Sequence, residues 1–161
     1  MIEQIIKKAK WLDKRIVFPE GDEPRTLRAA EVLHNEKIVT PIILGNPDPV
    51  SNLAKQNGVD LSGITIIDPD NSEDIEDFAQ EYYTLRKHKG ISQETARNTI
   101  TDPLFFGAMT VRKGQTDGSV AGAAHATSDV IRAAIQIIGL AEGSSVVSSF
   151  FLMIMPDGKV Y

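Results

Sequence analysis

Asp117-Gly-Ser-Val-Ala-Gly-Ala-Ala-His-Ala-Thr-Ser-Asp-Val-Ile-Arg132 is the stretch from which the fold is predicted. It begins as a turn and a short strand, breaks at its central glycine, and restarts as a helix whose N-cap is expected at Thr127 or Ser128. Helix N-termini leave backbone N–H groups unpaired and carry a partial positive charge, so they hold anions. Gly122 permits close backbone approach, and Arg132 offers a guanidinium fork suited to phosphate. The stretch therefore predicts a cradle for a phosphate or carboxylate at a strand-to-helix junction.

The same junction has a plainer interpretation, which spacing alone leaves open. Small-residue loops followed by Ser, Thr or Asp are ordinary helix starts, and Arg132 could be a surface residue. His125 is more often a packed or capping residue than a ligand. No second histidine, cysteine or carboxylate beside it completes a metal set, so no metal site is predicted.

Upstream of the junction, the chain alternates between helix and strand. An amphipathic helix opens the chain, and helices are expected near 24–35 and 50–56, with Asp22 or Glu23 capping the first of these. Apolar strands are expected at 15–19, 40–44 and 64–68. These strands are apolar on both faces, as a parallel sheet covered by helices requires. The right-handed crossover rule then predicts an α/β fold with a layered, open, mostly parallel sheet flanked by helices.

Three more helices are expected between the third strand and the junction, at 72–88, 92–100 and 103–112, the last two capped by Ser92 and Asp102. The first ends in Leu85-Arg-Lys-His-Lys-Gly90, whose cations suit the C-terminal end of a helix. Alternatively, this basic cluster meets a polyanionic ligand. In the junction helix, the side chains expected to be buried are Ile131, Ala134, Ile135 and Ile138.

The last part of the sequence predicts a long apolar strand over 146–155, followed by the turn Pro156-Asp-Gly-Lys159. Residues 150–155 carry no charge and would form an exposed, aggregation-prone edge if they stayed unpaired. Another chain or a continuation of the sequence is therefore expected to cover them. The expected domains are an α/β domain I over 1–140, lacking its C-terminal elements, and the start of a domain II over 141–161.

Composition excludes several classes of function. The chain has 161 residues, a net charge of −5 and no cysteine, which rules out disulfides, thiolate metal sites and cysteine nucleophiles. No basic run predicts nucleic-acid binding. No segment predicts a membrane span or a signal peptide, so a cytoplasmic location is expected. No glycine-rich dinucleotide fingerprint and no Walker sequence is present.

Five runs, distributed in order over essentially the whole chain, carry a family resemblance: Pro19-Glu-Gly-Asp-Glu-Pro-Arg-Thr-Leu-Arg28, Leu85-Arg-Lys-His-Lys-Gly90, Asp102-Pro-Leu-Phe-Phe-Gly-Ala-Met109, Asp117-Gly-Ser-Val-Ala-Gly-Ala-Ala-His125 and Gly143-Ser-Ser-Val-Val-Ser-Ser-Phe-Phe-Leu152. They resemble phosphotransacetylase (phosphate acetyltransferase), and acyl- and butyryl-transferring relatives share much of the pattern. The resemblance implies reversible acetyl transfer between acetyl phosphate and coenzyme A. It also implies a fold like that of isocitrate and isopropylmalate dehydrogenases, with two α/β domains around a cleft and subunits that pair as dimers.

The resemblance also implies site residues. Arg86 and Arg132 match family arginines implicated in binding coenzyme A or acyl phosphate, and the run from Gly122 to Ser128, with His125 and Thr127, matches the phosphate-side loop. The substrates would be acetyl phosphate, phosphate and coenzyme A or acetyl-CoA, with no permanently bound cofactor. The proposed catalytic Asp and Ser-Arg pair of the family have no counterpart here. The chain is thus expected to be an N-terminal part, inactive alone, that forms a homodimer or pairs with a C-terminal half.

Two other functions remain as alternatives. The chain could be a non-catalytic domain that keeps an anion site and pairs with a partner through the strand at 150–155. A nicotinamide-dependent dehydrogenase fits by fold analogy alone, and fold does not carry function. The titration range of His125 makes it a conceivable base, although a packed role is the more frequent one for such a histidine.

Overall fold

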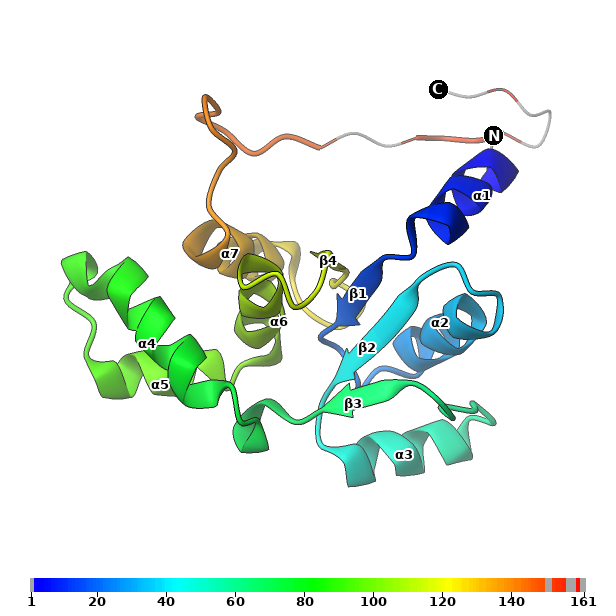
Figure 1. Cartoon of the computed structure of the whole chain (residues 1–161), viewed down its shortest axis with the longest axis horizontal. Helices are drawn as coiled ribbons and strands as arrows, with labels where there is room; N and C mark the ends of the chain where they lie inside the picture. The colour runs from blue at the N-terminus through cyan, green and yellow to red at the C-terminus, as the bar shows by residue number, and fades with distance from the viewer. Residues whose placement is uncertain (1, 150–151, 156–158, 160–161) are drawn as a thin grey trace.

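A computed structural model of the chain describes residues 2–149, 152–155 and 159. Its centre is a four-stranded parallel sheet with the strand order β3-β2-β1-β4 (Figure 1). The strands are β1 (Arg15–Phe18), β2 (Thr40–Leu44), β3 (Thr65–Ile67) and β4 (Gly118–Ser119). The predicted α/β fold with a parallel sheet flanked by helices is confirmed.

The helices follow the predicted order, and three of them begin at a proline that directly follows a capping residue. They are α1 (Ile2–Leu12), α2 (Pro24–Asn35), α3 (Pro47–Gln56), α4 (Ile75–Arg86), α5 (Gln93–Ile100), α6 (Pro103–Arg112) and α7 (Thr127–Ile137), with single 3-10 turns η1 (Pro69–Asn71) and η2 (Lys87–Lys89). Side-chain oxygens of Glu23, Ser92 and Asp102 accept backbone N–H groups at the starts of α2, α5 and α6. Each cap satisfies a donor that the first helical turn leaves without an intrahelical partner.

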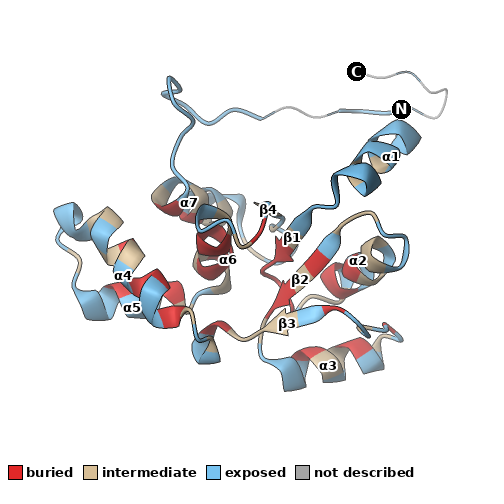
Figure 2. Ribbon diagram, viewed as in Figure 1, coloured by how far each residue is buried: buried red, intermediate tan, exposed pale blue. Residues whose placement is uncertain are grey.

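Two apolar layers hold the helices on the sheet. Ile43 faces a cluster that includes Leu27 of α2 and Val50 of α3. Val17 and Leu44 belong to the other cluster, to which α4, α5, α6 and α7 contribute. The two phenylalanine rings at its centre, Phe78 and Phe106, have centroids 4.9 Å apart and are fully buried. Figure 2 shows the buried residues concentrated where the helices meet the sheet and each other.

The short strand β4 is joined to β1 by a side chain as well as by the ladder. The Asp117 carboxylate accepts the backbone N–H of Arg15 at 2.8 Å and the ammonium of Lys14 at 2.8 Å. The hydrogen bond from Lys14, then that from Arg15, holds the pKa of Asp117 below its usual value. A two-residue strand therefore keeps its register beside β1.

Helix α1 forms as predicted, but its apolar side is not covered. It contains no buried residue, and Figures 1 and 2 show it projecting from the end of the sheet. Trp11 is 82% exposed, and Ile2 and Ile5 are each 53% exposed. An amphipathic pattern therefore predicted the helix correctly without identifying what packs against it.

Four expectations are wrong in detail. The helix expected at 72–88 is shorter, because η1 and η2 bracket α4. The N-cap of α7 is Ala126, not Thr127 or Ser128. Helix α7 buries Ala133 and Ile137, whereas Ile131, Ile135 and Ile138 stay exposed, because its contact with α6 lies on a different side of the helix. The described part of 146–155 forms no strand beyond a single bridge at Ile154, because an extended segment becomes a strand only by pairing; residues 150–151 and most of the turn after it lie outside the described residues.

Candidate functional site

The strand order creates a crevice at the carboxyl edge of the sheet. From β1 the chain proceeds to β2 and β3 on one side, and then returns to place β4 on the other side of β1. In open α/β sheets, ligands bind outside the carboxyl ends of the strands, at the point where the strand order reverses. Here that point lies between β1 and β4, so the segments after these two strands define the candidate site.

The Glu20 carboxylate, just beyond β1, occupies the loop that follows β4. Its side chain is about 2% exposed. Oε2 accepts the backbone N–H groups of Gly122 at 3.0 Å and Ala123 at 2.8 Å, and Oε1 accepts those of Ala124 at 2.8 Å and His125 at 2.9 Å. Successive N–H groups that point inward form an anion-binding concavity. In this protein a carboxylate of the chain itself fills that concavity.

The loop keeps Glu20 ionised despite its burial. Desolvation by burial, the largest single effect, raises the pKa of Glu20. The hydrogen bonds from Ala124, the His125 ring, the His125 backbone and Ala123 together outweigh it and lower the pKa from 4.5 to about 2. Carboxylates that accept several backbone N–H groups are stabilised in the charged form in this way. Glu20 is therefore a fixed negative charge at neutral pH.

Two glycines allow this arrangement. A Cβ on Gly21 would clash with the Leu44 carbonyl oxygen and with a methyl group of Ile43, so only glycine fits where β1 leaves the sheet. The Gly21 N–H donates to that same carbonyl at 3.1 Å. Gly122 has φ of 110°, in the region that glycine adopts readily. Both ends of the Glu20 contact are thus set by backbone geometry that other residues disfavour.

A second brace connects the start of α2 with the same loop. Arg25 Nη2 donates to the Ala123 carbonyl at 2.7 Å, and Arg25 Nε donates to Glu23 at 2.8 Å. The side-chain hydrogen bond from Arg25, followed by the backbone one, lowers the pKa of Glu23 to about 2. The loop after β4 is therefore held by Glu20 from inside and by Arg25 from the solvent side.

A cavity of about 560 Å³ opens at the carboxyl ends of β1 and β2. His125 lines it, opposite residues that follow the strands and belong to α3. The polar side chains that share this lining are Asp22, Asn46, Asn52 and Gln56, and the apolar lining includes Pro19, Leu44, Val50, Leu53 and Pro103. A largely apolar hollow with a few polar groups is typical of a small-molecule site.

The start of α7 presents a different environment. Its N-cap residue, Ala126, offers no side-chain cap, and Thr127 and Ser128 are exposed in the first turn. The first backbone N–H groups of a helix have no intrahelical acceptor. Arg132, one turn after Ser128, is 57% exposed and forms an ion pair of 3.1 Å with Asp129. An exposed pair of this kind is weak and opens readily to a competing anion.

Arg86, the last residue of α4, lies against Tyr82 and near α7. Burial, the largest effect, raises the pKa of the Tyr82 hydroxyl, and the adjacent Arg86 guanidinium opposes that rise. Tyr82 donates to Gln136 of α7 at 2.7 Å. Gln136 is one helical turn from Arg132, on the same side of α7. Arg86 Nε is buried and has no hydrogen-bond partner among the described residues.

The predicted site residues therefore fall into two groups. Gly122 and His125 belong to the loop filled by Glu20. Thr127, Ser128 and Arg132 lie at the start of α7. Arg86 is connected to α7 by Tyr82, which it lies against and which donates to Gln136. The backbone N–H groups of Gly122 and His125 donate to Glu20 and are therefore not free for a phosphate in this structure. Sequence reasoning missed Glu20, although an acidic residue before a glycine at the end of a buried strand was a usable signal.

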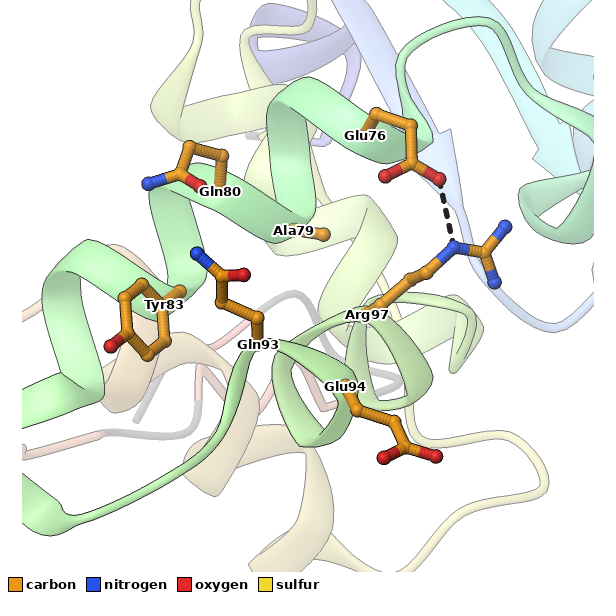
Figure 3. Close-up of a pocket in the computed structure, with 7 residues that line it drawn as sticks. All are labelled: Glu76, Ala79, Gln80, Tyr83, Gln93, Glu94 and Arg97. Carbon is orange, nitrogen blue, oxygen red and sulfur yellow. Dashed lines mark hydrogen bonds and ion pairs between the residues drawn. The ribbon is translucent and has the colours of Figure 1, made fainter.

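A second hollow lies away from these residues, between α4 and α5 (Figure 3). Its volume is about 290 Å³, and most of the residues that line it carry a polar group. Arg97 donates to Glu76 at 2.8 Å across it, while Glu94 points away from this pair (Figure 3). None of the predicted site residues contributes to this lining.

The described residues lack two further features. Within residues 2–149, 152–155 and 159, no group of three or more His, Cys, Asp or Glu side chains is arranged to hold a metal ion. Over the same residues, no helix combines the length and the apolar character needed to cross a membrane.

The fold and the hollow at the carboxyl ends of β1 and β2 define a class: an α/β domain with a candidate small-molecule site at the carboxyl edge of a parallel sheet. The whole chain, residues 1–161, matches the family described as phosphate acetyl/butaryl transferase, and the chain belongs to that family. The phosphate acetyltransferase of Thermoanaerobacterium thermosaccharolyticum is 48% identical over 157 residues, which are 98% of this chain and 47% of that protein. The phosphate acetyltransferase of Acetivibrio thermocellus is 44% identical over 97% of this chain and 46% of its own length.

A solved phosphotransacetylase structure has the same fold. The phosphotransacetylase from Streptococcus pyogenes superposes with a TM-score of 0.92 at 36% identity, covering 99% of this chain and 49% of that one. The chain therefore spans about half the length of the relatives that it matches.

Proposed function

We propose that this chain takes part in reversible acetyl transfer between acetyl phosphate and coenzyme A, as part of a phosphate acetyltransferase. The observation that carries the proposal is that relatives 48% and 44% identical, which match nearly the whole of this chain, are named phosphate acetyltransferase. Because the family description also includes butyryl transfer, a longer acyl group is the alternative substrate. Coenzyme A and acetyl-CoA act as substrates in this proposal, and no cofactor is permanently bound.

The proposed phosphate contacts lie at the start of α7. Thr127 and Ser128 supply hydroxyls and first-turn N–H groups, and Arg132 supplies a guanidinium when its exposed pair with Asp129 opens. Arg86, whose buried Nε has no hydrogen-bond partner among the described residues, contributes a second positive charge. Gly122 and His125 act differently, because their N–H groups are already used: Gly122 shapes the loop, and the His125 ring faces the hollow.

The chemistry is attack of the coenzyme A thiolate on the acetyl carbonyl, with phosphate as the leaving group. Negative charge grows on the carbonyl oxygen and on the departing phosphate. The two guanidinium groups stabilise the charge of the phosphate in this proposal. We assign no base to the residues of this chain, and we propose that the 161-residue chain binds its substrates without efficient turnover.

We also propose that the residues from 141 onward belong to a second domain, and that a homodimer or a C-terminal half covers apolar surface left open here. Ile131, Ile135 and Ile138 form an exposed row on α7. An exposed apolar row of this kind favours association with another chain or domain. A cytoplasmic location stays a prediction.

A chimera tests the proposed function. This chain replaces the 157 aligned residues of the phosphate acetyltransferase of Thermoanaerobacterium thermosaccharolyticum, and acetyl-CoA formation from acetyl phosphate is followed by thioester absorbance. The chimera is expected to turn over, and Arg132→Ala is expected to lower its kcat/KM about tenfold or more, the loss of one charge-assisted hydrogen bond. Arg97→Ala, which removes a guanidinium far from the proposed site, is the control and is expected to leave kcat/KM within about twofold.

Three results would count against the proposal. A folded chimera without acetyl transfer would refute the assignment of this chain to that reaction. Equal losses in the Arg132 and Arg97 variants would refute the proposed phosphate contacts. Efficient turnover by the 161-residue chain itself would refute the proposed need for further residues.

A further inference from the structure

The His125 ring lies between the buried carboxylate and the hollow. Nδ1 is 2.9 Å from Oε1 of Glu20, and the side chain of His125 is 34% exposed. Nε2 makes no hydrogen bond to any of the described residues. Since His125 lines the 560 Å³ cavity, Nε2 is the ring nitrogen available to a ligand in that cavity.

The chemistry of the carboxylate decides which ring nitrogen carries the proton. An ionised carboxylate only accepts hydrogen bonds, whereas a neutral imidazole has one donor and one acceptor nitrogen. Because Nδ1 faces an acceptor, it must carry the hydrogen, and Nε2 is then the acceptor. Neutral histidine in water prefers the other tautomer, so the protein imposes the less common form.

Four backbone contacts make this assignment rigid. Glu20 cannot swing away from His125 without releasing the N–H groups of residues 122–125, which are each within 3.0 Å of its oxygens. The hydrogen bonds from Ala124, from the ring and backbone of His125 and from Ala123 keep the pKa of Glu20 at about 2, so the carboxylate remains an acceptor over the whole neutral range. The loop that resembles a phosphate cradle thus serves to fix a side chain.

We propose that Glu20 is a positioning residue that holds His125 as the Nδ1–H tautomer and so presents Nε2 to the cavity as a hydrogen-bond acceptor. The ligand group that it meets is a donor, and for the substrates proposed above this is an amide N–H or the thiol of coenzyme A. This choice of ligand rests on the proposed function, whereas the tautomer does not. Glu20 itself touches no ligand and acts through His125.

Nuclear magnetic resonance of the ring nitrogens tests the tautomer in the ligand-free 161-residue chain. The three histidines, His34, His88 and His125, are isotope-labelled and assigned by single substitution to Asn. At alkaline pH, Nδ1 of His125 is expected to give a protonated, pyrrole-type resonance and Nε2 an unprotonated, pyridine-type resonance. His34 and His88, whose rings make no hydrogen bond to a carboxylate among the described residues, are expected to show the opposite preference and serve as internal controls.

Glu20→Gln and Glu20→Asp separate positioning from general destabilisation. A glutamine amide presents both a donor and an acceptor, so the His125 tautomers are expected to become mixed, while Glu20→Asp retains the acceptor and restores part of the Nδ1–H signature. Folding of each variant is checked by the amide spectrum away from residues 120–128. The inference is overturned by an Nε2–H tautomer in the wild-type chain, or by a Glu20→Gln variant whose His125 tautomer is unchanged.

Titration with coenzyme A tests the ligand. The Nε2 resonance of His125 is expected to shift upfield as it accepts a hydrogen bond, and that of His88 is expected to stay. If calorimetry shows binding and the Nε2 resonance does not move, the role of His125 in the cavity is refuted. If coenzyme A does not bind at all, the proposed function fails, and the tautomer result stands by itself.

Discussion

Replacing Glu20 by Gln tests how much the buried carboxylate contributes to stability. The folded protein lowers the pKa of Glu20 from 4.5 to about 2, which by linkage corresponds to about 3 kcal/mol of folding free energy at neutral pH. The hydrogen bonds that Glu20 accepts from the loop give a loss of stability of similar magnitude. A glutamine keeps the shape, but its NH2 group faces backbone N–H groups of the loop, and each buried donor left without an acceptor costs about 1–3 kcal/mol.

Urea unfolding followed by circular dichroism measures the difference. At neutral pH, Glu20→Gln is expected to unfold with a free energy about 3 kcal/mol below that of the wild type. Because the folded-state pKa is depressed, this contribution is complete above the unfolded pKa of 4.5 and is lost as the pH falls toward 2. The gap between variant and wild type should therefore narrow over that range.

Glu73→Gln removes an exposed carboxylate that no hydrogen bond among the described residues engages, and serves as the control, with a change below about 0.5 kcal/mol. A Glu20→Gln variant as stable as this control at neutral pH would refute the reasoning. A gap that did not depend on pH would also refute it, because the stabilisation would then not come from the carboxylate charge.

Five further substitutions, two of them controls, test the packing and the surface. Gly21→Ala is expected to destabilise the fold by about 1–3 kcal/mol through its clash with the neighbouring strand, whereas Gly90→Ala, with φ of 80° but open space around it, should cost about 1 kcal/mol; equal losses in urea unfolding would contradict this. Phe78→Ala is expected to lower the free energy of unfolding by about 3–5 kcal/mol because the ring is fully buried. Val32→Ala, the control at a 45% exposed position, is expected to lower it by less than about 1 kcal/mol. Arg97→Ala, which breaks an exposed ion pair, should shift the thermal midpoint little, at about 0.5 kcal/mol or less; a larger loss would mean that the pair holds α4 and α5 together.

The sequence predicted the elements of the sheet well, because the information is local. Apolar runs between capping residues and prolines mark β1, β2 and α2, and the structure places them within a few residues of those signals. The side of α7 that is buried was not predictable in the same way. Isoleucines at 131, 135 and 138 have the spacing of a core stripe, but α6 packs on the side of Ala133 and Ile137.

Only part of the candidate site could be predicted from the sequence: the loop around Gly122 could, and its contact with Glu20 could not. The pattern around Gly122 predicted an anion-binding loop, and the anion that its backbone N–H groups contact belongs to Glu20, which is more than one hundred positions earlier in the chain. Only the pairing of β4 with β1 brings the two together. Local pattern can identify a concavity for negative charge, and three-dimensional structure is needed to tell whether the chain itself already fills it.

Calorimetric titration of the 161-residue chain with acetyl phosphate and with coenzyme A tests the central claim most directly, namely that the start of α7 binds the phosphoryl group. The account predicts that Arg97→Ala binds each ligand with the same affinity as the wild type. Arg132→Ala and Arg86→Ala are each expected to bind about tenfold or more weakly than the wild type. Undiminished binding by the Arg132 and Arg86 variants would contradict the account.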